Sequence, residues 1–141
     1  MRHDIRGSLN RLPRGVWLLA AVYTLASLWH FAHNAEYLAY YPNMPPWITR
    51  EIVYAAWLAV ASVGVVGAWL MWQGWLASGA GVMAAYGALG LDGLAHYGLA
   101  PCSAHTWVAN LTIAFEVATG AVLMVCAAAW AARQGLRRWY P

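Results

Sequence analysis

Four long runs of apolar residues, separated by short stretches that contain proline, glycine or polar residues, dominate the chain. An α-helix needs roughly 20 predominantly apolar residues to cross a hydrocarbon core of about 30 Å, and each run is long enough. The pattern predicts an all-α integral membrane protein, a four-helix transmembrane bundle in up-down-up-down order. We expect one domain, residues 1–141, with spans over about 16–40, 47–72, 75–97 and 103–130.

The breaks between the runs carry residues that end helices. The stretch "YYPNMPP" at 40–46 contains three prolines, and proline removes a helical hydrogen bond and clashes with the preceding turn. The stretch "WQGW" at 72–75 is a tight connection, and "GLAPCS" at 98–103 closes the third run. Ser103 is expected to cap the start of the fourth helix.

Two further patterns accompany these spans. Small residues in the third run are expected to let that helix approach its neighbours closely; they are Ala80, Ala84, Gly87, Ala88 and Gly90. Aromatic residues near the breaks are expected to form a belt at the outer membrane surface; they are Tyr37, Tyr40, Tyr41, Trp47, Tyr97 and Trp107.

Composition and charge agree with a membrane location. Of the 141 residues, 62% are apolar and only 9% charged, which excludes a soluble domain of this size because such a surface could not be kept in water. The basic residues are all arginines, and most lie before the first run or after the last, so the positive-inside rule places both termini in the cytoplasm. These arginines are Arg2, Arg6, Arg11, Arg14, Arg133, Arg137 and Arg138.

The same charge distribution bears on the compartment and the partners. We expect the inner membrane of a bacterium, contact with the lipid bilayer and no nucleic-acid partner. A secretory signal also begins with basic residues, but the first apolar run exceeds the usual core of about 7–15 residues, so we expect it to remain as a span. Arg50 would lie outside, with Glu51 as its neighbour.

Ionisable residues interrupt the apolar runs, all of them in the outer half of the expected bundle. The first span carries His30, His33 and Glu36, the third carries Asp92 and His96, and the fourth carries His105 and Glu116. An ionisable group in hydrocarbon costs at least about 2.5–3.5 kcal/mol on insertion scales. These side chains are therefore expected to face inward and to satisfy one another.

Helical angles support a common centre. At about 100° per residue, Asp92 and His96 differ by about 40°, and His105 and Glu116 by about 20°. On the first span, successive steps of three residues differ by about 60° around the helix, so His30 and Glu36 lie on either side of His33.

Imidazole and carboxylate groups at these spacings are typical of a transition-metal site in a helical bundle. We predict zinc, iron or copper, held by His30, His33, His96 and Glu116, with Glu36, Asp92 and His105 as further ligands or hydrogen-bond partners of the ligands. A metal-bound water or dioxygen species acting on an apolar or lipid substrate would be the natural chemistry. Whether the protein is an enzyme is left open by the sequence.

Three alternatives remain open. The polar core could be structural, in a noncatalytic accessory or assembly subunit that meets a larger membrane complex or a second copy of itself. A metal-free enzyme of the lipid-isomerase type could move protons with a carboxylate and a histidine. Two histidines, such as His30 or His33 with His96, could hold a b-type haem, although a haem pocket does not need three carboxylates.

Overall fold

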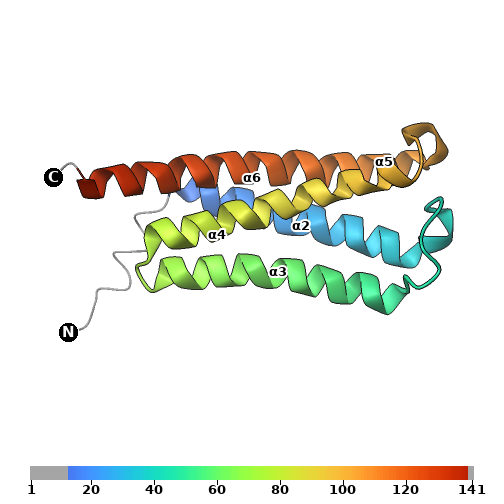
Figure 1. Ribbon diagram of the computed structural model, residues 1–141, viewed down its shortest axis with the longest axis horizontal. Helices are drawn as coiled ribbons and strands as arrows, with labels where there is room; N and C mark the ends of the chain where they lie inside the picture. Colours follow the sequence, from blue (N-terminus) through green and yellow to red (C-terminus); the bar gives the residue numbers. More distant parts are fainter. Residues whose placement is uncertain (1–12, 140–141) are drawn as a thin grey trace.

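The protein is helical throughout the part of the chain that the structure describes. The computed structural model describes residues 13–139, with side chains as far as residue 134. No strand occurs within 13–139, so the prediction of an all-α fold is confirmed there (Figure 1). The α-helices and 3-10 helices (η) are α2 (Arg14–Glu36), η1 (Leu38–Tyr40), α3 (Arg50–Trp72), α4 (Leu76–Leu89), η2 (Gly90–Leu94), α5 (Ala95–Leu99), η3 (Cys102–Ala104) and α6 (Trp107–Trp139).

Three helices of the described chain are long and apolar enough to cross a membrane: α2, α3 and the part of α6 from Trp107 to Gln134. This finding is compatible with a membrane location. The expected third span is helical over 76–99 but is divided into α4, η2 and α5. Four spans, and an orientation with both termini inside, stay predictions, and the arginines at positions 2, 6 and 11 lie outside the described residues.

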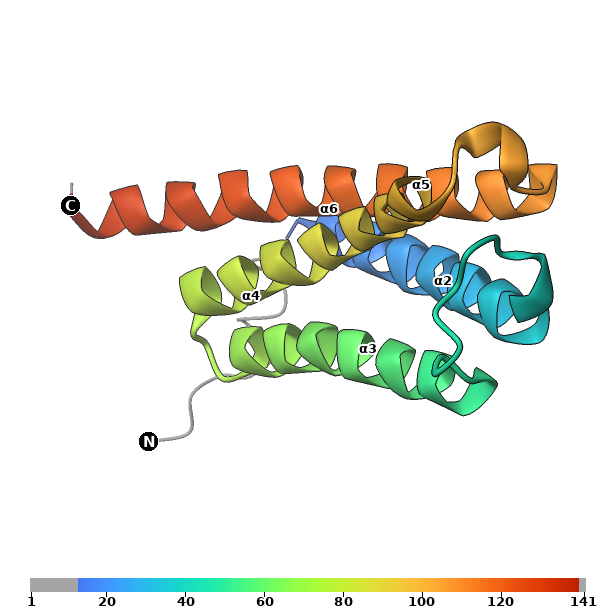
Figure 2. The same ribbon diagram turned by 45° about the vertical axis from the view of Figure 1, so that its right-hand side comes forward.

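The helices lie side by side along the long axis of the molecule (Figures 1 and 2). α6 packs against α4 and α2, and α3 packs against the same two helices on the other side. Residues 37–49 and 100–106 lie together at one end of the molecule, which we call the loop end, and the short α3–α4 connection lies at the other end (Figure 1). Away from the loop end, α3 and α4 are close, and they diverge toward it (Figure 2).

The first two helices are shorter than expected. α2 ends at Glu36 and the chain continues into η1, so the first span stops before its expected end at about residue 40. α3 begins at Arg50, where the Thr49 side chain accepts a hydrogen bond from the Ile52 N–H. The tight connection expected at 72–75 is present, with Gly74 at a φ of 86°, a conformation that glycine adopts without steric cost.

The fourth helix begins later than expected. Ser103 lies inside the 3-10 turn η3, and the extended His105 separates this turn from α6. The hydroxyl of Thr106 accepts a hydrogen bond of 3.2 Å from the Ala109 N–H and so caps the first turn of α6. The prediction that Ser103 caps this helix is therefore wrong.

Glycines bring the third segment against α6. Gly87, Gly90 and Gly93 recur every third residue, and a Cβ on Gly87 would lie 2.6 Å from the Gly120 carbonyl oxygen. Residues three apart eclipse in a 3-10 helix, so η2 keeps Gly90 and Gly93 on one face. The α-helical angle of about 40° expected between Asp92 and His96 therefore does not hold, because the segment between them is partly 3-10.

The larger apolar core cluster lies toward the end away from the loops, and a smaller one around Ile113 lies at the loop end. The outer surface is apolar as well. Tyr23, Met71, Tyr86 and Leu123 are buried at the centre of the larger cluster. Large apolar side chains cover the outside of the helices, a surface suited to lipid. Those more than 60% exposed along the helices include Leu18, Leu25, Leu58 and Val65.

Candidate functional site

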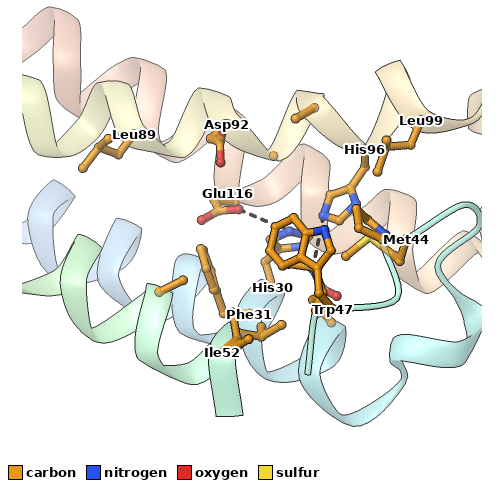
Figure 3. A pocket seen from close by; sticks show the side chains of 17 residues that line it. His30, Phe31, Met44, Trp47, Ile52, Leu89, Asp92, His96, Leu99 and Glu116 are labelled. Atoms are coloured by element: carbon orange, nitrogen blue, oxygen red, sulfur yellow. Dashed lines mark hydrogen bonds and ion pairs between the residues drawn. The ribbon is translucent and has the colours of Figure 1, made fainter. Parts of the chain in front are cut away.

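A pocket opens at the loop end between α2, α3 and the η2–α5 segment, with α6 behind it (Figure 3). Its cavity volume is 380 Å³, within the range of about 300–1,000 Å³ typical of small-molecule sites. Most of the lining is apolar, with a few polar groups at the back. The lining residues include Phe31, Met44, Trp47, Ile52, Leu89 and Leu99, and the polar members are His30, Asn34, Asp92, His96 and Glu116.

The buried face of α2 supplies a polar stripe to the interior. Tyr23, Ser27, His30 and Asn34 follow one another at spacings of four, three and four residues, which places them on one face of the helix. All four are buried, whereas Leu25 on another face is 66% exposed. The polar side chains of this stripe therefore point into the protein, whereas Leu18, Leu25 and Leu28 are exposed.

The contacts of His30 with Thr112 favour one tautomer of its ring. The Thr112 hydroxyl lies 3.0 Å from the carbonyl oxygen of Ala109, to which it donates, and its oxygen is then available to accept from His30 Nδ1, which lies 3.2 Å away. In the neutral ring the opposite nitrogen, Nε2, then carries a lone pair. That lone pair faces Glu116, whose Oε2 lies 3.6 Å away.

Glu116 is the most unusual group of the site. The residue is 1% exposed, and its Oε2 has no hydrogen-bond partner. Two acceptor atoms, this oxygen and His30 Nε2, therefore face each other with one proton to share. Either the carboxyl holds the proton beside a neutral imidazole, or the imidazole holds it and forms an ion pair.

His96 and Asn34 form a second polar pair beside the first. The Asn34 amide nitrogen lies 3.2 Å from His96 Nε2 and donates to it, which leaves the Asn34 Oδ1 buried without a partner. The centroids of the His96 and His30 rings are 5.3 Å apart. Figure 3 shows His30 and His96 near each other in the pocket, with the Asp92 carboxyl group directed toward Glu116.

Tyr41 lies in the middle of the histidines and is buried, not part of a surface belt. Its ring centroid is 4.9 Å from that of His96 and 6.2 Å from that of His105. Its hydroxyl lies 2.8 Å from His33 Nδ1. Burial raises the pKa of Tyr41 to about 12, so the phenol stays neutral and can donate to His33. The expectation that Tyr41 faces the membrane surface is therefore wrong.

His105 is buried just outside the pocket. Its Nδ1 donates to the carbonyl oxygen of Pro101 at 3.2 Å, and its Nε2 has no partner. The His105 and His96 ring centroids are 6.2 Å apart. His30, His96, His105 and Glu116 thus approach one another, although His105 does not line the cavity.

Glu36 lies outside the pocket, at the protein surface. It is exposed and accepts hydrogen bonds from Arg50 at 2.9 Å and from Tyr54 at 2.8 Å, at the surface where α2 meets α3. Arg50 is therefore paired with Glu36, and the expected pairing with Glu51 is wrong. At about 100° per residue Glu36 lies 120° around α2 from His30, and because His30 faces the interior, Glu36 faces out.

The structure therefore brings together only some of the residues expected to bind a metal. Asp92 is exposed but lines the same pocket as His30, His96 and Glu116. His33 does not line the pocket, and its ring is hydrogen-bonded to Tyr41. Among the described residues, no group of three His, Cys, Asp or Glu side chains is arranged to hold a metal ion. A preformed metal centre is thus not part of this arrangement.

Several residues of the site were missed by sequence reasoning, which followed the ionisable residues alone. Ser27 and Asn34 are neutral, yet they extend the stripe of His30 at helical spacing. Tyr23 and Tyr41 are aromatic and resemble ordinary membrane residues until their burial is known. The spacing of four residues between His30 and Asn34 is the signal that could have identified the amide.

Comparison of the chain with models of protein families, with curated protein sequences and with solved structures finds no match.

Proposed function

We propose that this is a membrane protein that takes an apolar small molecule from the bilayer into the pocket at the loop end, where the His30–Glu116 pair exchanges a proton with it. The proposal includes four spans with both termini in the cytoplasm. The observation that carries it is the buried carboxylate oxygen of Glu116, unpartnered at the back of a mostly apolar cavity. Such an oxygen is costly to bury alone, and a polar group on a bound molecule would satisfy it.

The rim of the pocket supports entry from the lipid side. Trp47, Ile52 and Leu99 line the cavity and are 67%, 42% and 40% exposed. Ile52 lies on α3 and Leu99 on α5, so exposed residues of two helices, and not only of the loops, line the opening. An apolar molecule could therefore reach the site while its chain stays in hydrocarbon.

The chemistry follows from the proton shared by two facing acceptor atoms. A bound molecule with an acidic X–H bond would give its proton to His30 Nε2 or to the Glu116 carboxylate, and the same pair would return a proton to another position. Thr112 holds the imidazole in the required tautomer. Proton transfer of this kind leaves the oxidation state of the molecule unchanged and needs no further reactant.

The test is photolabelling in phospholipid nanodiscs with a long-chain alcohol that carries a diazirine. We expect label on the buried α2 segment around His30 and Asn34, which only a probe inside the pocket can reach. Ala56 lines the pocket, so Ala56→Trp should abolish this label. Ala55→Trp, on the neighbouring exposed position outside the lining, is the matched control. Unchanged labelling in Ala56→Trp would reject the proposal.

A second candidate, binding of zinc, iron or copper, is favoured by one specific observation. Glu116 Oε2 and His105 Nε2 are buried without a donor, and His30 Nε2 carries a lone pair. A metal ion would require these side chains to move together, since no such group is formed among the described residues. Elemental analysis of protein purified without chelator tests this, and a Soret band on the same sample would indicate haem.

The alternative of a noncatalytic accessory subunit predicts a negative result in both the labelling and the metal measurement. A purely structural polar core would give no pocket label that Ala56→Trp removes and no stoichiometric metal. Normal folding with both results negative would favour a noncatalytic partner of a larger membrane complex or a homo-oligomer.

A further inference from the structure

Buried oxygens at the back of the pocket have no hydrogen-bond partner in the described structure. Two lining residues each hold a buried oxygen without a partner, Oε2 of Glu116 and Oδ1 of Asn34. The two residues are 1% and 7% exposed, so bulk water does not satisfy these atoms. A bound molecule that donates hydrogen bonds would satisfy these atoms, whereas an acceptor group in the same place would leave both oxygens unpaired.

The charges around the cavity favour a cation. The lining contains two carboxyl side chains, Asp92 and Glu116, and neither an arginine nor a lysine. The two histidines of the lining offer lone pairs: His96 Nε2 accepts from Asn34, and His30 Nε2 faces the carboxylate. In a low-dielectric site an ammonium ion pairs strongly with a carboxylate. A bound amine that takes up the proton shared by Glu116 and His30 forms such a pair.

The apolar walls suit the rest of such a molecule. Phe31 and Trp47 present aromatic rings to the cavity, and Met44, Ile52 and Leu99 supply aliphatic surface (Figure 3). Aromatic faces also attract cations. The combination is an apolar slot with carboxyl groups and hydrogen-bond acceptors at one end.

We infer that the ligand is a lipophilic amine, bound as its ammonium ion with N–H groups directed at Glu116 and Asn34. This inference rests on the proposed function and names the chemical class of its ligand. Fatty acids and anionic lipids are disfavoured, because neither an arginine nor a lysine lines the cavity among the described residues. The ammonium can belong to a single-chain amine or to the headgroup of phosphatidylethanolamine.

Competition against the photoactivatable alcohol tests the inference in phosphatidylcholine nanodiscs. Dodecylamine, dodecanol and dodecanoate share one chain and differ only in the head group. We expect the amine to displace the probe from wild-type protein at a concentration at least about tenfold lower than the alcohol, as a charge-assisted hydrogen bond provides. Displacement by added phosphatidylethanolamine would also support the inference and would identify the headgroup as the source.

Variants separate a specific site from general partitioning of the amine. Glu116→Gln should reduce the preference of amine over alcohol to less than about threefold. Asp92→Asn, at an exposed position that lines the pocket, should reduce it in part. Glu51→Gln removes an exposed carboxyl outside the lining and should leave the preference unchanged.

The outcomes distinguish this inference from the proposed function. If alcohol or dodecanoate competes as well as the amine, the ammonium assignment is overturned while a ligand pocket remains. The assignment is equally overturned if Glu51→Gln lowers the preference as much as Glu116→Gln. If the alcohol probe does not label the pocket of the wild-type protein, the proposed function is rejected, and the inference that rests on it is rejected with it.

Discussion

The close approach of α4 to α6 positions the pocket, and one added methyl group should disrupt it. A Cβ on Gly87 would lie 2.6 Å from both the Gly120 oxygen and the Met124 nitrogen, whereas ordinary contact begins at 3.4 Å. Both neighbours are backbone atoms and cannot turn away as a side chain would. Gly87→Ala therefore requires the two helices to separate by about 0.8 Å, and a gap of 0.5–1 Å already forfeits a quarter to a half of the dispersion energy at each contact.

The expected loss is about 2–3 kcal/mol of unfolding free energy, the upper part of the range for overpacked sites. Unfolding in mixed micelles, followed by circular dichroism, measures it. Gly81 is the matched control in the same helix, because no heavy atom lies within 4 Å of its Cβ position. Gly81→Ala should be neutral or slightly stabilising, since alanine is the better helix former. Equal stability of the two variants would refute the packing argument.

Three further predictions address the polar groups. Thr112→Val leaves the His30 Nδ1–H without an acceptor and should cost about 1–3 kcal/mol of unfolding free energy. Thr119→Val is the control: the Thr119 hydroxyl bonds only carbonyls of its own helix, so its loss should cost less than about 0.5 kcal/mol. Glu116→Gln should keep stability within about 1 kcal/mol of the wild type, because the new amide can donate to His30 Nε2, yet should abolish any proton exchange. Glu36→Gln should leave pocket labelling and metal content unchanged, because Glu36 pairs with Arg50 at the surface. A loss of labelling or of metal in this variant would show that Glu36 is part of the site.

The helical class and most of the apolar segments could be predicted from the sequence, because length and composition of the runs decide whether a helix can lie in lipid. The 3-10 turn through Gly90 and Gly93 could not, although its cause is visible afterward in the glycines at every third position. A hydropathy profile does not reveal this three-residue spacing of glycines, because glycine is close to neutral on hydropathy scales. The break depends on how closely α6 approaches, which is a tertiary contact.

The candidate site was predicted in part. His30, His96 and Glu116 lie around one pocket, as the inward-facing argument required. The argument failed for Glu36 because it fixed the spread of angles on the first span without fixing which residue faces the centre. Once His30 is known to be buried, the same angles place Glu36 outside. A charged neighbour on the next helix, Arg50, then satisfies it.

The hydrogen-bond directions in the site were beyond prediction from sequence. The lone pair of His30 Nε2 follows from a chain of donors that begins with the Ala109 carbonyl and passes through the Thr112 hydroxyl. Thr112 lies four residues before Glu116 on α6, but its partner on α2 depends on how the two helices are set against each other. The unpartnered oxygen of Glu116 is the result of that register.

The most direct measurement is a high-resolution map of the protein in lipid nanodiscs, taken in the presence of dodecylamine. The account predicts density in the pocket, with a polar atom within hydrogen-bond distance of Glu116 Oε2 and Asn34 Oδ1 and an apolar chain leaving past Trp47 and Ile52. A pocket filled by the protein's own side chains, with Glu116 hydrogen-bonded inside the bundle, would contradict it.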